Sequence, residues 1–337
     1  MEIYSKDDRK GKGSEDRKRE RGKMSTAAAI YIGAYTIQML IARLEGDGEP
    51  EIINEFTAYT RIGEDLSKNN LLSENGMKLA GQALEEMRGI AEELKVDQCS
   101  IVASGSLRNA LNKTTLFVLC NKMFGHYPQL LSNKDEARLH FAGTVTKEFA
   151  ALPIIVAYIG HYGVKIACGT MNGIDIVSEI PVGPGTLNEK FQMNHSSFGF
   201  FGMRKIMSYL KDEFQDFSRE FSAWKKNAGF SPELFMVGPF PTSYVSLALD
   251  MPIIDKNNIP SMPFPKSQLI SISRRIAALS PEEKRKIPYL DQNMAESISA
   301  CAMIQRAIVD VCGMDEFHVS PNGLCMGVLK LLPTLLF

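Results

Sequence analysis

The sequence has 337 residues, which suits two domains that each bury a core of their own. Hydrophobic residues make up 45% and charged residues 23% of it, the values of a globular protein, and a formal net charge of −1 gives no overall reason to expect nucleic acid or an anionic membrane as a partner. No apolar run approaches the ~18–20 residues that a membrane span needs.

Residues 1–24 hold nine Lys/Arg and six Asp/Glu and almost nothing apolar. Such a segment cannot bury enough surface to fold, so we expect a disordered, solvated charged tail; an arm that binds a polyanion is the alternative. The six cysteines form no C-x-x-C pair and lie mostly in apolar stretches, which favours buried free thiols. Together these features predict a cytoplasmic protein.

The first half of the remaining chain alternates strands and helices. Two β segments within 27–45 meet at Gly33, and residues 50–63 supply a third. Ser73 is the expected N-cap of an amphipathic helix. A strand, a helix over 105–125 that closes at Gly125, another strand and a helix from residue 133 or 134 follow.

From residue 151 the same order begins again, with a strand, a turn at Gly160 and a second strand. Residues 251–268 are rich in proline and predict a loop, and Ser280 and Glu283 form a capping box. This repetition predicts an α/β protein built by internal duplication, with two lobes around a cleft in which a ligand would bind. We expect the lobes to span 25–150 and 151–337.

Seven short segments carry a family resemblance. They are YIGAYT (31–36), TRIGEDL (60–66), SLRNALN (106–112), SNKDEARL (132–139), YIGHYGVK (158–165), IPVGPGTLNEKF (180–191) and HVSPNGLCMGVL (318–329). Their order and spacing resemble those of the exopolyphosphatase/guanosine pentaphosphate phosphohydrolase (Ppx/GppA) family, whose members have the duplicated actin-like ATPase (ASKHA, ribonuclease H-like) fold. The resemblance covers most of residues 27–330.

The resemblance implies roles for particular residues. In the family, backbone N–H groups of two hairpins bind the phosphate chain, hairpin aspartates hold Mg²⁺, an arginine contacts phosphate and a glutamate activates water. The matching positions here make Glu136 the catalytic base, and Arg108, Gly33 and Gly160 the substrate-binding residues. Polyphosphate or a guanine nucleotide is then the candidate ligand and a homodimer the candidate assembly, with no membrane and no specific nucleic acid as a partner.

The sequence departs from the family where the chemistry is concentrated. Both metal-binding aspartates are replaced, by Tyr31 and Tyr158, and a neutral phenol is a poor ligand for Mg²⁺. We therefore expect no metal site, and no cofactor unless the protein is active with Mg²⁺. The turns also carry Tyr35 and Tyr162. These four tyrosines should meet in the cleft and fill it.

Four other side chains each have two interpretations. Glu136 is either the inherited base or an acidic residue that favours the start of a helix. Arg108 contacts phosphate or forms an ion pair. His161 is a turn histidine without a partner or a new ligand, and Lys165 is a surface or cleft-edge charge or an anion contact.

Three functions remain in view. The first is a catalytically impaired Ppx/GppA-like protein that acts by binding a nucleotide or another protein. The alternative is an active exopolyphosphatase or (p)ppGpp phosphohydrolase that releases phosphate with Glu136 as general base. The third is a structural actin-like module. Whether the chain is an enzyme therefore stays open at this point.

Overall fold

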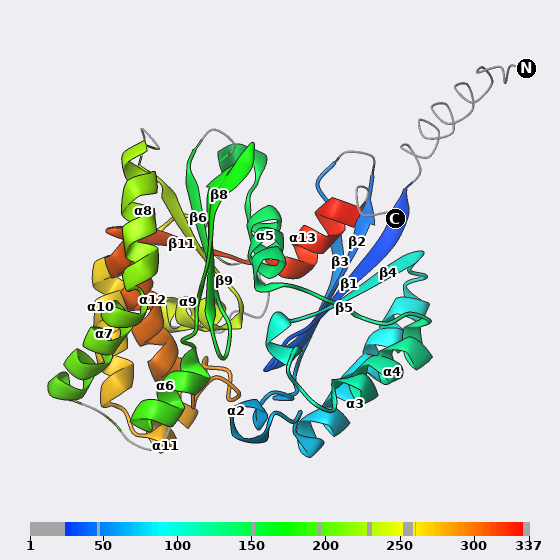
Figure 1. The fold of residues 1–337 in the computed structure, drawn as a ribbon, viewed down its shortest axis with the longest axis horizontal. Coiled ribbons are helices and arrows are strands. Elements are labelled where there is room, and N and C mark those ends of the chain that lie inside the picture. The colour runs from blue at the N-terminus through cyan, green and yellow to red at the C-terminus, as the bar shows by residue number, and fades with distance from the viewer. Residues whose placement is uncertain are drawn as a thin grey trace, which may run out of the picture.

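The computed structural model describes residues 24–45, 48–149, 152–193, 197, 199–227, 231–251, 259 and 261–332. The predicted charged tail, apart from its last residue, lies outside these residues. The described chain forms two lobes, each with a mixed β-sheet, and two helices between the sheets (Figure 1). No helix in these ranges has both the length and the apolar character that a bilayer span requires.

The first lobe contains a five-stranded sheet in the order β3-β2-β1-β4-β5. Its hairpin β1–β2 and strand β3 are antiparallel, whereas β4 and β5 continue the sheet in parallel with β1. Helices α3 and α4 cover the outer face of this sheet (Figure 1). The elements of this half are β1 (Ser25–Ile32), β2 (Thr36–Leu44), β3 (Glu51–Tyr59), α2 (Leu66–Asn69), α3 (Glu74–Glu93), β4 (Gln98–Ala103), α4 (Lys113–Phe124), β5 (Gln129–Leu130) and α5 (Asn133–Thr144).

The second lobe repeats this arrangement in the order β10-β11-β9-β6-β7-β8. Strands β6, β7 and β8 are antiparallel neighbours, β9 and β11 extend the sheet in parallel, and β10 is an addition at its edge. The two sheets therefore confirm the predicted duplication. The elements are β6 (Ile154–Ile159), β7 (Val164–Thr170), β8 (Gly173–Ile180), α6 (Pro184–Phe191), α7 (Phe200–Glu213), α8 (Gln215–Asn227), β9 (Glu233–Val237), α9 (Pro239–Leu249), β10 (Phe264–Pro265), α10 (Lys266–Ala278), α11 (Pro281–Arg285), α12 (Ile298–Cys312), β11 (Glu316–Ser320) and α13 (Leu324–Leu331).

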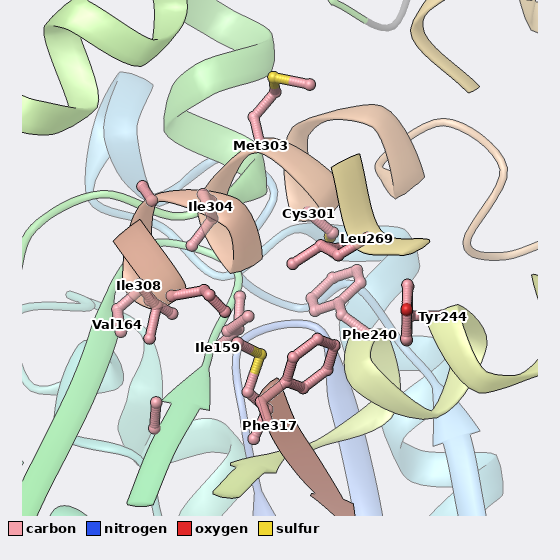
Figure 2. Packing of buried hydrophobic residues seen from close by; sticks show 14 of the residues in the cluster. Ile159, Val164, Phe240, Tyr244, Leu269, Cys301, Met303, Ile304, Ile308 and Phe317 are labelled. Atoms are coloured by element: carbon pink, nitrogen blue, oxygen red, sulfur yellow. The ribbon is translucent and has the colours of Figure 1, made fainter. Parts of the chain in front are cut away.

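The largest hydrophobic cluster lies on the outer face of the second sheet, where helices of the second lobe pack. Figure 2 shows part of it, with Ile159 and Val164 of the hairpin facing Ile304 and Ile308 of α12. Each Å² of apolar side-chain surface that this cluster removes from water stabilises the fold by roughly 25 cal/mol, and this packing fixes the position of the β6–β7 hairpin. The hairpin is thus a rigid support for the side chains in its turn.

Successive side chains of a strand point to opposite faces of the sheet, and in the first strand of each hairpin a tyrosine lies on the inner face. In β1, Ile30 and Ile32 pack under α3 and α4, whereas Tyr31 points to the opposite face, between the sheets. In β6, Ile159 faces the outer cluster and Tyr158 faces inward. Tyr31 and Tyr158 are 2% and 9% exposed.

Helices α5 and α13 fill the space between the sheets, and each packs on the lobe opposite to the strand that precedes it. Helix α5 follows β5 of the first sheet and packs on β6, β7 and β9, whereas α13 follows β11 of the second sheet and packs on β1 and β2 (Figure 1). The helices cross closely, since a Cβ atom on Gly143 would lie 2.0 Å from the Gly323 carbonyl oxygen. This crossing joins the lobes; the boundary near residue 150 stays a prediction.

Several local predictions are confirmed. The Ser73 side chain caps α3, Gly125 ends α4 in the left-handed conformation, and Ser280 and Glu283 form a complete capping box.

Two others are wrong. The helix predicted over 105–125 is a 3₁₀ turn at Gly105–Leu107 followed by a helix that begins only at Lys113, because the Asn112 side chain pairs with both backbone groups of Leu72. The loop predicted to reach residue 268 ends at β10, where Phe264 pairs with Phe317.

Candidate functional site

The two hairpin turns face each other between the lobes and have the same backbone geometry. Gly33 donates its N–H to the Thr36 carbonyl at 2.9 Å, and Gly160 donates to the Gly163 carbonyl at 2.9 Å. A Cβ atom at either glycine would lie 3.0 Å from that carbonyl oxygen, so the tight turn favours glycine at both positions. Their predicted contact with substrate stays a prediction.

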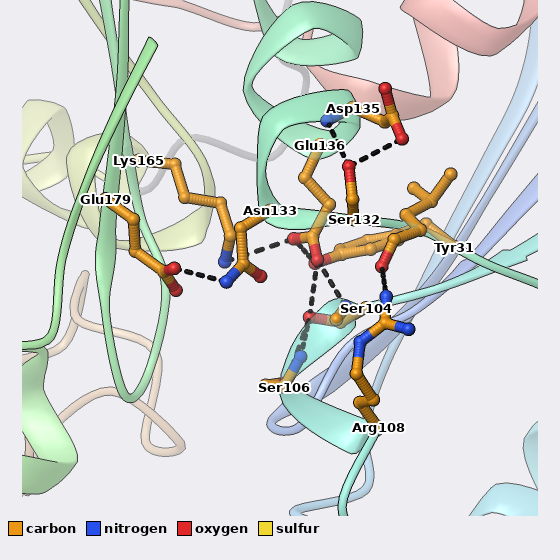
Figure 3. A network of polar contacts seen from close by, with 12 residues as sticks. Tyr31, Ser104, Ser106, Arg108, Ser132, Asn133, Asp135, Glu136, Lys165 and Glu179 are labelled. Carbon is orange, nitrogen blue, oxygen red and sulfur yellow. Dashed lines mark hydrogen bonds and ion pairs between the residues drawn. The ribbon is translucent and has the colours of Figure 1, made fainter.

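Glu136 lies between the hairpins, in the first turn of α5. Ser132 caps this helix, and the carboxylate of Glu136 is fully buried. Its Oε2 accepts a hydrogen bond from the Tyr31 hydroxyl at 3.1 Å, and its Oε1 accepts from the Ser104 hydroxyl at 3.0 Å and from the Gly105 N–H (Figure 3). The residue predicted as the base is therefore central to the site.

A buried ion pair holds the same carboxylate. The Lys165 ammonium nitrogen lies 3.1 Å from Glu136 Oε2, and Lys165 is only 5% exposed. The expectation of a surface or cleft-edge charge at Lys165 is therefore wrong. Lys165 pairs directly with Tyr158 across the hairpin, so the strand register points its long side chain inward toward α5 (Figure 3).

Both inward tyrosines stay protonated. Burial is the main cause that raises the pKa of Tyr31, followed by the charge of Glu136, and burial likewise raises the pKa of Tyr158. Phenols in this state donate hydrogen bonds and carry no negative charge for a cation.

His140 is a site residue that the sequence analysis missed. Its ring stacks on Tyr158 with 3.8 Å between ring centroids, and both of its nitrogens are buried without a hydrogen-bond partner among the described residues. Burial, then the charge of Lys165, lowers its pKa well below the usual value, so the ring is neutral. One signal was available: His140 follows Glu136 by four residues, and therefore lies on the same helical face.

The other two tyrosines each cross to the opposite lobe. Tyr35, from the first hairpin, lies in the hydrophobic cluster of the second lobe and donates its hydroxyl to the Asn293 carbonyl at 2.6 Å. Tyr162, from the second hairpin, packs on the cluster of the first lobe and donates to the Gly63 carbonyl at 2.8 Å. His161 lies between them, stacked on Tyr35 at 4.6 Å and edge-on to Tyr162.

The space left beside the turns is small. A cavity of about 60 Å³ is lined by both turns, by Ser104 and Ser106, and by Lys165 and Glu179. Arg108 is not among its lining residues: its side chain is exposed and donates to the Leu131 carbonyl at 2.9 Å. The four cleft tyrosines and Glu136 are thus brought together, whereas Arg108 lies to one side.

The donor set around this cavity does not fit Mg²⁺, which takes carboxylate, phosphate and water oxygens in octahedral geometry. Tyr31 and Tyr158 occupy the ends of both first strands, and the buried carboxylate of Glu136 already has an ammonium partner. The carboxylate that lines the cavity itself, that of Glu179, accepts a hydrogen bond from the Asn133 amide and is a single such ligand. Across the described ranges, no three His, Cys, Asp or Glu side chains gather in a way that could hold a metal.

Comparison with known proteins gives one consistent family. A sequence profile described as the Ppx/GppA phosphatase family matches residues 40–333. A curated protein of Fusobacterium nucleatum, a bifunctional 3-dehydroquinate synthase/phosphatase, is 26% identical over 316 residues, which are 90% of this chain and 46% of that protein. The chain thus spans about half the length of this relative.

Solved structures agree on the fold. A Ppx/GppA family member of Aquifex aeolicus is 21% identical with a TM-score of 0.74, over 91% of this chain and 97% of that one. An exopolyphosphatase of Cytophaga hutchinsonii is 16% identical with a TM-score of 0.80, over 92% and 98% of the two chains. At these identities the likeness establishes the duplicated actin-like fold.

Proposed function

The chain belongs to the Ppx/GppA phosphatase family, and from this premise we propose that it is a catalytically impaired member that acts by binding. The hydrolysis of a phosphoanhydride needs an oriented water molecule, a base to activate it, and positive charge on the phosphoryl oxygens.

The state of Glu136 carries the proposal. A carboxylate offers about four lone-pair sites. Tyr31 and Lys165 occupy Oε2, and Ser104 and the Gly105 N–H occupy Oε1. These four donors saturate the carboxylate, so no lone pair is left to accept a proton from a water molecule. A base in this state must break its buried ion pair before it can act.

The shape of the cleft supports the same conclusion. The rings of Tyr35, His161 and Tyr162 lie in contact between the lobes. At Pro239, which lines the same small cavity, the backbone has no N–H to donate to a phosphate oxygen. A cavity of about 60 Å³ has room for a few water molecules and not for a phosphate chain.

Phosphate release tests the proposal. We expect the full-length protein, incubated with polyphosphate or pppGpp and with Mg²⁺ or Mn²⁺, to release no more phosphate than the double variant Glu136→Gln/Lys165→Met. The double variant is the control because it removes the carboxylate without leaving the lysine charge buried alone. Circular dichroism would establish that it is folded.

The alternative, an active hydrolase with Glu136 as its base, predicts the opposite result. Phosphate release by the wild-type protein that disappears in the double variant would overturn the proposal. A ligand that binds only the folded state raises the melting temperature. Because the cavity of about 60 Å³ has no room for a phosphate chain, we expect that GTP, ppGpp and polyphosphate do not raise it.

A further inference from the structure

Helix α7 has two exposed phenylalanines at its start. The helix lies at the outer edge of the second lobe, where Ile206 and Leu210 belong to the hydrophobic cluster and the helix packs on α12 (Figure 1). Its first turn lies outside that cluster. Phe200 and Phe201 are 60% and 83% exposed, with their ring centroids 5.8 Å apart. Exposed apolar residues scattered singly are ordinary, but an adjacent pair beside further rings marks a contact surface.

Three cations lie at ring faces beside this pair. The ring centroids are within cation–π distance of Arg204 over Phe200 (5.9 Å), Lys205 over Phe191 (6.0 Å) and Lys190 over Tyr209 (4.5 Å). The rings of the last two pairs contact each other, with 5.5 Å between their centroids. Because Arg204 and Lys205 are consecutive, the four rings and three cations form one surface, which we call the α7 patch.

The α7 patch has an excess of positive charge. Within the described ranges, none of its three cations forms an ion pair with a carboxylate. The acidic residues of α7 are Asp212 and Glu213, which end the helix more than three turns beyond its first residue. Glu213 acts on the patch at Tyr209, whose pKa is raised first by burial and then by this carboxylate. Glu189 accepts a hydrogen bond from Ser67 of the other lobe. The start of α7 is therefore both apolar and positive, which fits an anionic partner.

Charge and area favour a lipid surface over a second copy of the chain. A symmetric dimer through the α7 patch would bring the same cations together, which is unfavourable. The two exposed phenylalanines offer roughly 300 Å² of apolar surface, well below the ~800 Å² per partner of a standard protein interface. A membrane surface accepts so small a site, because Phe side chains enter the boundary between headgroups and acyl chains while Lys and Arg attract anionic headgroups.

We propose that the α7 patch binds reversibly to membranes that contain anionic lipid. Phe200 and Phe201 enter the interface, and the cations beside them contact headgroup phosphates. The net charge of −1 gave no reason to expect a membrane partner, but a net charge does not describe how charge is distributed over the surface. The proposal goes beyond the proposed function and does not depend on the state of Glu136.

Sedimentation of the full-length protein with vesicles tests the proposal. We expect binding to phosphatidylcholine vesicles with about 30% phosphatidylserine, weaker binding as the salt concentration rises, and little binding to phosphatidylcholine alone. Phe200→Ser/Phe201→Ser should weaken binding about tenfold or more, because it removes the apolar contact, and Arg204→Gln should weaken it about fivefold. Leu111→Ser is the matched control, since Leu111 is 76% exposed on the first lobe, and should bind like the wild type. Equal melting temperatures would establish that the variants are folded.

Several results would overturn the proposal. One is the absence of sedimentation at millimolar anionic lipid. Unchanged binding by the double serine variant would mean that other charges, such as those of residues 1–24, hold the vesicles. An equal loss in Leu111→Ser would show that the effect is not specific to the patch. Self-association, or binding of a single-stranded oligonucleotide, that the double serine variant abolishes would assign the patch to another partner if vesicles do not bind. The phosphate-release assay is independent of all of these, so the two proposals can fail separately.

Discussion

The β1–β2 and β6–β7 hairpins are two copies of one structure that have acquired different tasks. Each carries a tyrosine at the end of its first strand, Tyr31 or Tyr158, and a second in its turn, Tyr35 or Tyr162. The inward tyrosines surround the α5 site, and the turn tyrosines each enter the opposite lobe. The packing of a turn tyrosine from each lobe into the hydrophobic cluster of the other is thus close to symmetric.

The polar side chains break this symmetry. Opposite Tyr31 the first hairpin has Gln38, whereas opposite Tyr158 the second has Lys165. The first turn has Ala34 where the second has His161. Only the second hairpin therefore supplies the cation for Glu136 and the ring between the two turn tyrosines. A duplicated backbone fixes positions, and single side chains then decide which copy carries charge.

The largest effect should come from the charged position. We expect Lys165→Met to lower the free energy of unfolding by about 3–5 kcal/mol, because it leaves Glu136 buried without its cation. The equivalent change in the other hairpin, Gln38→Met, should cost about 1 kcal/mol or less, since that side chain is partly exposed and uncharged. Urea unfolding followed by circular dichroism measures both.

A second variant separates the charge from the packing. Glu136→Gln/Lys165→Met removes both charges and should be clearly more stable than Lys165→Met alone. If the double variant is no more stable than the single one, the loss comes from the packing of the lysine side chain, and the asymmetry that we describe is not electrostatic.

Substitution of either turn tyrosine should lower the free energy of unfolding by a similar amount, because both pack into the opposite lobe. Tyr35→Ala should cost about 3 kcal/mol and Tyr162→Ala about 2 kcal/mol, because Tyr35 is the more deeply buried of the two rings. Tyr35→Phe keeps the ring and should lose only about 1 kcal/mol with its hydrogen bond to Asn293. Unfolding in urea provides the free energies.

Coupling between the two rings sharpens this test. Both contact His161, so the loss in the double alanine variant should differ from the sum of the single losses by about 0.5–3 kcal/mol. Strict additivity would mean that the two tyrosines hold independent contacts and do not act together across the lobes.

The sequence predicted what depends on local chemistry and on repetition. The Ser73 cap, the αL end at Gly125 and the capping box at Ser280 depend on side chains within a few residues, and the repeat made the duplication visible. The Lys165–Glu136 pair was not predictable in this way, because it joins a strand of one lobe to a helix that comes from the other.

The missed break in the helix before Lys113 has the same origin. Asn112 lies within the helix predicted over 105–125. Its side chain instead hydrogen-bonds with the backbone of Leu72, which is 40 residues away in the sequence. His140 also appeared as one polar residue on a helix, and only the approach of Tyr158 makes it part of the site. Contacts between distant segments decided each of these positions.

The smallest effect concerns the histidine that the first turn lacks. Burial, then the charge of Arg61, lowers the pKa of His161 in the folded protein to about 4, whereas an unfolded histidine has a pKa of about 6.5. Below pH ~6.5 the unfolded chain therefore binds a proton that the folded chain does not, so the free energy of unfolding falls as the pH falls toward 4. One histidine contributes a slope of at most about 1.4 kcal/mol per pH unit.

His161→Ala gives the second turn the side chain of the first and should remove that contribution. The variant also loses the stacking on Tyr35, but this loss is the same at every pH and leaves the slope unaffected. His140, whose pKa is lowered in the same direction, keeps a residual slope in the variant. Urea unfolding at intervals between pH 4 and pH 7 should therefore give a shallower dependence for His161→Ala than for the wild type. Equal slopes would mean that His161 gains its proton as readily in the folded chain as in the unfolded one, and that the ring is not enclosed between the two tyrosines.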